Sequence, residues 1–112
     1  MKNKFGVPCS KIKDKIEDVD VHCSSEEQAM ALACGSYLIT GKRASVYMQN
    51  SGFARCIDII TSLYRPYGIP YPETLISIRH KPYHHSFIGT ITKHLLRILD
   101  YSYDAKIVEQ EK

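Results

Sequence analysis

Apolar segments alternate with segments of helical periodicity along the whole chain. Five apolar or β-rich runs have the length of strands, and they cover residues 5–7, 19–23, 44–48, 74–78 and 105–108. Stretches with a helical pattern separate most of these runs. Such alternation is typical of βαβ units, so the predicted fold class is α/β, with an open, mainly parallel sheet flanked by helices.

Start and stop signals indicate where the first two helices lie. Ser10 is placed to cap a short helix that ends near residue 17. Ser24 and Glu27 have the spacing of a capping box, and a helical stretch over residues 28–40 follows them. Gly41 comes directly after that stretch and suits the end of a helix.

Two further helices follow in the second half of the chain. The Asn-Ser-Gly step at residues 50–52 predicts a turn, and the pattern after it predicts a helix over residues 53–64. That helix should end before the breakers Pro66, Gly68 and Pro70. The last helix is predicted from apolar residues at helical spacing, namely Ile91, Leu95 and Ile98.

Composition indicates one ordinary globular domain. The chain has 112 residues, of which 44% are hydrophobic and 24% charged, and this size suits a single core. No apolar run approaches the roughly 20 residues of a membrane span. The basic start of the chain leads into no apolar signal region. We therefore expect a soluble, cytoplasmic protein that does not bind membranes.

Cysteine spacing and charge argue against several classes of protein. The four cysteines form no C-x-x-C pair, which indicates buried thiols more than a zinc site or a disulfide framework; they are Cys9, Cys23, Cys34 and Cys56. The formal charge is +3, but Lys and Arg are scattered among Asp and Glu. Nucleic-acid binding is therefore not predicted.

Candidate chemistry lies in the segments that follow the predicted strands, because ligands of open parallel sheets gather at the carboxyl ends of the strands. Four such segments stand out, at residues 8–10, 24–26, 49–52 and 79–85. Taken alone, their residues have ordinary explanations. Glu26 would complement a helix dipole, residues 50–52 would form a turn, and the adjacent His84 and His85 would be solvated. The fold by itself names no reaction.

The order and spacing of these segments resemble a known family. The matching stretches are residues 6–10, Glu26 with 28–35, residues 40–42, residues 46–52, and His85 with Gly89 and 92–96. They are similar to the pyrimidine-binding (PYR) domain of sulfopyruvate and phosphonopyruvate decarboxylases, which depend on thiamine diphosphate. The resemblance implies one PYR-type domain over residues 1–112. The helix that usually precedes the first strand is missing, so one face of the sheet is expected to be uncovered.

The resemblance also implies roles for individual residues. Glu26 would hydrogen-bond the aminopyrimidine ring of the cofactor and promote proton removal from its thiazolium carbon. Residues of the 50–52 segment would line the cofactor cleft, namely Asn50, Ser51 and Gly52. His85 would be a second catalytic residue. The implied substrate contacts are Cys9, Ser10, Arg79 and His84.

One half of a complete active site is absent from the sequence. Nothing resembles the Gly-Asp-Gly motif, with its downstream Asn, that holds magnesium and the diphosphate in these enzymes. The resemblance therefore implies a hetero-oligomer in which a diphosphate-binding (PP-domain) β subunit holds the magnesium. The expected function is the α subunit of a two-chain decarboxylase of a small anionic 2-oxo acid, sulfopyruvate or phosphonopyruvate.

Two departures from the family pattern keep alternatives open. Phe53-Ala54-Arg55 stands where the family has Leu-Gly-Asn, and Ile78-Arg79-His80 replaces Trp-Arg-Gly. A non-catalytic assembly or regulatory module with the PYR fold is the main alternative. A small basic binding domain is a third reading, but it would require clustered cationic residues.

Overall fold

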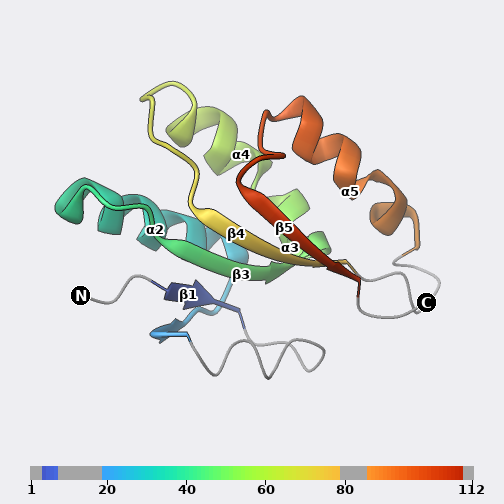
Figure 1. Ribbon diagram of the computed structural model, residues 1–112, viewed down its shortest axis with the longest axis horizontal. Helices are drawn as coiled ribbons and strands as arrows, with labels where there is room; N and C mark the ends of the chain where they lie inside the picture. The colour runs from blue at the N-terminus through green and yellow to red at the C-terminus, as the bar shows by residue number, and fades with distance from the viewer. Residues whose placement is uncertain (1–3, 8–18, 79–85, 110–112) are drawn as a thin grey trace.

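The structure is a computed structural model that describes residues 4–7, 19–78 and 86–109. Its described strands form one sheet in which every pairing is parallel, in the order β2-β1-β3-β4-β5 (Figure 1). The strands are β1 (Lys4–Gly6), β2 (Val21–His22), β3 (Ser45–Gln49), β4 (Glu73–Ile78) and β5 (Ala105–Glu109). The predicted α/β class is confirmed, and each predicted strand overlaps an observed one.

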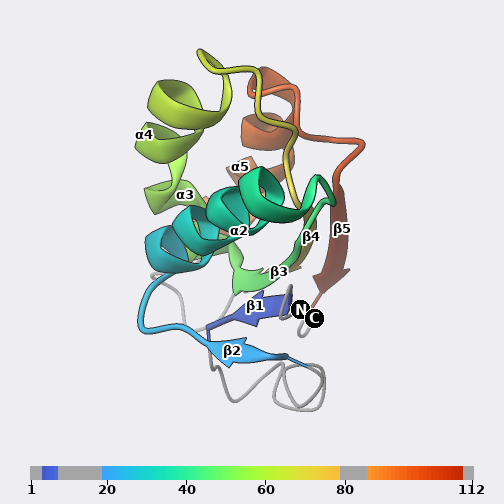
Figure 2. The ribbon, with the colours of Figure 1, turned by 90° about the vertical axis from the view of Figure 1, so that its left-hand side faces the viewer.

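All described helices cover the same face of this sheet (Figures 1 and 2). They are α2 (Glu26–Thr40), α3 (Asn50–Arg55), α4 (Ile57–Ile59), the π-helix η2 (Ile60–Tyr64) and α5 (Ser86–Ile98). Val46 and Met48 of β3 are fully buried beneath these helices, whereas Ser45 and Tyr47 point to the opposite face and are half-buried. None of the described helices covers that opposite face.

The core contains an aromatic cluster between the helices and the end of the sheet. The rings of Tyr71 and Tyr101 stack with centroids 4.0 Å apart, and Phe53 meets Tyr101 edge-on at 5.2 Å. The buried hydroxyls are satisfied, because Tyr101 Oη lies 2.7 Å from Thr74 Oγ1 and Tyr64 Oη donates to the Met30 carbonyl at 2.6 Å. This cluster fixes α2 and α3 relative to the sheet.

The N-terminus of α2 differs slightly from the predicted one. The helix begins at Glu26, and Ser25, not Ser24, is the N-cap, because its hydroxyl accepts from the Gln28 backbone N–H at 3.1 Å. Gln28 completes the arrangement by accepting from the Ser24 backbone N–H at 2.7 Å. The predicted end is confirmed, since Gly41 adopts a left-handed φ of 73° and donates to the Tyr37 carbonyl.

The predicted turn at residues 50–52 is wrong. Gln49 is extended, and the chain passes directly from β3 into α3, so that these residues form the first turn of a helix. Asn50 is 1% exposed, and its Nδ2 donates to Thr92 Oγ1 of α5 at 3.1 Å. This tertiary contact outweighs the local turn preference of Asn-Ser-Gly.

Helix α5 was predicted correctly, but the apolar spacing matches its buried face only in part, since Leu95 packs against the core while Ile98 does not. The buried residues are Gly89, Thr92 and Leu96, whereas Ile98 is 78% exposed. The apolar spacing therefore indicates the helix without indicating its orientation. The buried polar pair of Asn50 and Thr92 accounts for the difference, because it turns the polar Thr92 toward the core.

The described cysteines are buried free thiols, as predicted for most of them; they are Cys23, Cys34 and Cys56. Burial raises the pKa of the Cys56 thiol to about 12, and the Glu27 and Glu26 carboxylates add to this effect while Arg55 opposes it. In the unfolded chain the thiol would titrate near its ordinary value of 9.0.

We predict from this pKa that the protein loses stability as the pH rises from 9 toward 12. The folded state retains the Cys56 proton over this range while the unfolded state releases it, so each pH unit removes up to about 1.4 kcal/mol. Cys56→Ser keeps the size of the side chain and removes this titration. Urea unfolding at several alkaline pH values should therefore give a shallower loss for Cys56→Ser, and equal slopes in the two proteins would contradict the assignment.

Candidate functional site

The strand order locates a ligand-binding position by the geometry of the sheet. The chain runs from β1 to β2 on one side and from β3 through β5 on the other, so the order reverses between β1 and β3. Ligands of open α/β sheets bind outside the carboxyl ends of strands at such a switch point. Helix α2 follows β2 and helix α3 follows β3, so the N-termini of both helices face this position.

Glu26 is a buried carboxylate at this position. It is the first residue of α2, where the Ser25 cap fixes the start of the helix, and its side chain is only 7% exposed. The N-terminal end of a helix favours a negative charge. Glu27, the next residue along the chain, is half-exposed. The structure thus separates two neighbouring acids that look equivalent in the sequence.

Gly52 provides the space that Glu26 occupies. A Cβ atom built on Gly52 would overlap Cγ, Cδ and Oε2 of Glu26, so the carboxyl group packs directly on the α3 backbone. Any larger residue at this place would displace the Glu26 side chain. The structure therefore brings Glu26 and Gly52 of the 50–52 segment together.

Arg55 is the residue of this site that sequence reasoning missed. Its Nη2 donates to Glu26 Oε1 at 2.5 Å, and its Nε lies 3.7 Å from Glu27 Oε1. The sequence indicated Arg55 only as a departure from the family pattern. Its partner lies 29 residues away on another helix, so no local spacing could have predicted the ion pair.

The other two residues of the 50–52 segment contribute differently. Asn50 is buried against Thr92 and joins α3 to α5, so it positions the backbone around Gly52. Ser51 is half-buried on the first turn of α3. The remaining predicted site residues lie outside the described residues and stay predictions; they are Cys9, Ser10, Arg79, His84 and His85.

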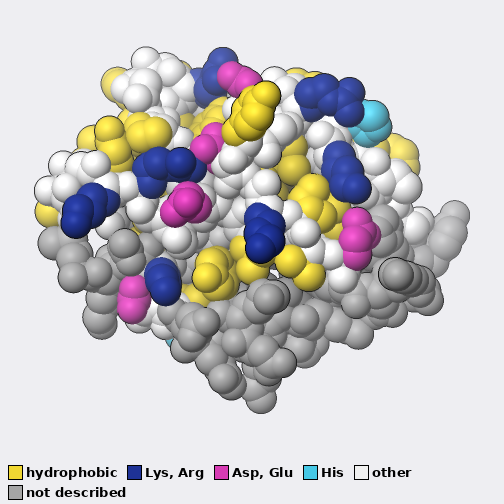
Figure 3. Space-filling view, in the orientation of Figure 1, with side chains coloured by type: hydrophobic (Ala, Val, Ile, Leu, Met, Phe, Trp, Pro, Cys, Tyr) yellow, Lys and Arg dark blue, Asp and Glu magenta, His cyan; other side chains and the backbone are white. Residues whose placement is uncertain are grey.

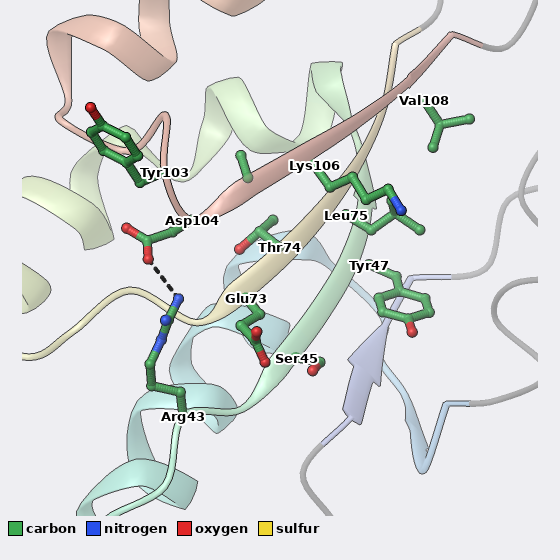
Figure 4. A pocket seen from close by; sticks show the side chains of 11 residues that line it. Arg43, Ser45, Tyr47, Glu73, Thr74, Leu75, Tyr103, Asp104, Lys106 and Val108 are labelled. Atoms are coloured by element: carbon green, nitrogen blue, oxygen red, sulfur yellow. Dashed lines mark hydrogen bonds and ion pairs between the residues drawn. The ribbon is translucent and has the colours of Figure 1, made fainter.

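A hollow on the face of the sheet that carries none of the described helices is separate from this site. It has a volume of about 630 Å³ and is lined by side chains that include Tyr47, Leu75, Lys106 and Val108, but by none of the residues around Glu26 (Figure 4). Its wall carries the Arg43–Asp104 ion pair, with 2.6 Å between Nη2 and Oδ1. We attach no chemistry to this hollow.

The surface carries no concentrated positive charge on the side that Figure 3 displays. Lys and Arg side chains are spread over it and alternate with Asp and Glu. Within residues 4–7, 19–78 and 86–109, no cluster of three or more His, Cys, Asp and Glu side chains could hold a metal ion. The helices in these ranges are too short or too polar to cross a membrane.

These features define the protein as a parallel α/β domain with a buried carboxylate at the switch point of its sheet. The chain is 37% identical to a sulfopyruvate decarboxylase subunit alpha of Methanocaldococcus jannaschii over 82 residues, which is 67% of the chain. It is 32% identical over 107 residues, or 84% of the chain, to the protein of that name from Methanothermobacter thermautotrophicus. The Methanococcus maripaludis protein of the same name is 34% identical over 82 residues.

The chain belongs to the family of these sulfopyruvate decarboxylase α subunits. The matched regions span 46%, 62% and 47% of the three relatives, so the chain corresponds to about half of their length or somewhat more. No family-level sequence profile matches the chain. The resemblance inferred from the sequence motifs is thereby confirmed at the level of the family.

Proposed function

We propose that this chain is the pyrimidine-binding subunit of a two-chain, thiamine-diphosphate-dependent decarboxylase that acts on sulfopyruvate. The observation that carries the proposal is the buried Glu26 carboxyl group on the bare α3 backbone at Gly52, in a relative of sulfopyruvate decarboxylase α subunits. A carboxyl group that is held in place and largely removed from water is suited to proton transfer. The Glu26 carboxyl group is therefore suited to contact an aminopyrimidine ring.

Glu26 would hold a proton between its carboxyl group and a ring nitrogen of the aminopyrimidine. Gly52 keeps the carboxyl group against the α3 backbone, and Asn50 anchors that backbone to Thr92, so the acid cannot swing away into water. When bound, thiamine diphosphate would supply the electron sink that lets carbon dioxide leave a 2-oxo acid. The sulfonate of the substrate would be recognised by residues of the segments 8–10 and 79–85. His85 would relay a proton, and the contacts would come from Cys9, Ser10, Arg79 and His84.

The exposed surface of α2 supports the proposal of a partner subunit. Residues 28–40 contain no charged side chain, and Leu38 and Ile39 of this stretch are 68% and 76% exposed. Helices that are apolar on every side are normally buried, so this surface fits an interface with another chain. We propose that the partner is a diphosphate-binding β subunit that also holds magnesium. The free cysteines agree with a reducing, cytoplasmic setting.

The proposal predicts that the purified chain binds thiamine diphosphate weakly and has no decarboxylase activity alone. No diphosphate motif occurs in this sequence, and the proposal assigns the missing contacts to a second chain. Calorimetric titration with magnesium present measures the affinity, and carbon dioxide release from sulfopyruvate measures the activity. Adding a chain with the Gly-Asp-Gly motif should create activity. Tight, magnesium-dependent binding by the isolated chain would contradict the two-chain arrangement.

A non-catalytic assembly or regulatory module is the second candidate. The ion pair of Arg55 with Glu26 favours it, because one oxygen of the essential carboxylate is already engaged. The activity of the complex with the partner subunit distinguishes the two candidates. If the chain is a non-catalytic module, this complex should be inactive on every 2-oxo acid.

A further inference from the structure

The Glu26 carboxylate is enclosed by two different groups. Oε2 and the end of the side chain pack on the α3 backbone at Gly52. Oε1 accepts from the Arg55 guanidinium at 2.5 Å. The Arg55 side chain is 61% exposed while that of Glu26 is 7% exposed, so the guanidinium lies on the solvent side of the carboxylate. Access to Oε1 from solvent therefore passes Arg55.

The Arg55 side chain is 61% exposed, so little packing holds it in place. Arg55 is the last residue of the short helix α3, which is interrupted at Cys56, and its long side chain keeps its charge hydrated when it swings outward. A second acid is within its reach, since Glu27 Oε1 lies 3.7 Å from Nε and is half-exposed. Arg55 can thus release Glu26 and keep an ion pair with Glu27.

We propose that Arg55 is a displaceable cover of Glu26, which must leave Oε1 before an aminopyrimidine can use the carboxyl group. The cover itself is independent of the cofactor, whereas its purpose rests on the proposed function. Arg55 contacts neither cofactor nor substrate in this scheme and acts only through Glu26. In the free subunit Arg55 covers the Glu26 carboxylate. When the ligand binds, the neutral aminopyrimidine takes the place of the Arg55 guanidinium at this carboxylate.

The first test measures the accessibility of Glu26 without any ligand. Arg55→Met removes the charge and retains most of the length, and Arg43→Met is the matched control, because Arg43 pairs with Asp104 elsewhere. Carbodiimide with an amine labels carboxyl groups, and peptide mass spectrometry quantifies the label at Glu26. Labelling at Glu26 should be several-fold faster in Arg55→Met and unchanged in Arg43→Met. Equal labelling rates in wild type and Arg55→Met would overturn the proposal.

The second test uses 4-amino-5-hydroxymethyl-2-methylpyrimidine, a probe that lacks the diphosphate and needs no partner chain. Its affinity, measured by NMR titration, should rise up to about five-fold in Arg55→Met, the factor that corresponds to about 1 kcal/mol for an ion pair whose Arg55 side is exposed. Weaker binding than wild type would mean that Arg55 supports the site and would overturn the cover. If no variant binds the probe although labelling responds to Arg55, the cover stands and the proposed function fails.

Discussion

Replacing Glu26 by Gln should lower the turnover of the assembled enzyme at least about 100-fold. A positioned acid or base typically contributes about 100-fold to 10,000-fold to a rate, and Gln retains the size of the side chain without the ionisable group. The burial of Glu26 against Gly52 makes this loss hard to compensate, since no water can easily replace the carboxyl group. Stability should change by about 1 kcal/mol or less, because Arg55 is exposed and can return to water.

Glu27→Gln is the matched control for this experiment. Glu27 lies on the same first turn of α2 and also faces Arg55, but it is half-exposed. Its replacement removes the same charge from the same helix end without touching the buried carboxyl group, so turnover should fall far less than in Glu26→Gln. Deuterium exchange at the thiazolium carbon in the complex isolates the proton-transfer step. A wild-type exchange rate in Glu26→Gln would mean that Glu26 is structural and that the proposed chemistry is wrong.

Replacing Gly52 by Ala should destabilise the protein by about 1–3 kcal/mol, the usual cost of forcing an extra carbon into a packed region. In an ordinary helix the same change stabilises by about 0.5–1 kcal/mol, because Gly is a poor helix former. The steric effect should win at this position, since the new Cβ would occupy the space of the Glu26 carboxyl group.

A double-mutant cycle separates the two effects. In a Glu26→Ala background the obstacle is gone, so Gly52→Ala should become neutral or stabilising, with a coupling of about 2 kcal/mol between the two changes. Gly35→Ala in α2 is the matched control, because a Cβ there would meet no atom within 4 Å and should stabilise. Urea unfolding of the four proteins and the control measures these values. Equal effects of Gly52→Ala in both backgrounds would show that the contact with Glu26 is unimportant.

The sequence by itself determined the secondary structure of most of the chain. Strands β3 and β4 are apolar runs, and α2 lies between a serine cap and Gly41, so local patterns locate them to within a residue or two. The family resemblance predicted that Glu26 and the 50–52 segment belong to one site, and the structure places Glu26 against Gly52.

Only the tertiary structure decided which groups surround the carboxylate. Asn50 begins a helix where its neighbours predict a turn, because Thr92 of α5 accepts its amide. Glu26 is buried and Glu27 is not, because only the former points at Gly52. Arg55 meets Glu26 because the sheet order brings the segments after β2 and β3 together beside β1. These contacts join residues far apart in sequence, and their geometry depends on how the helices pack on the sheet, which local preferences do not encode.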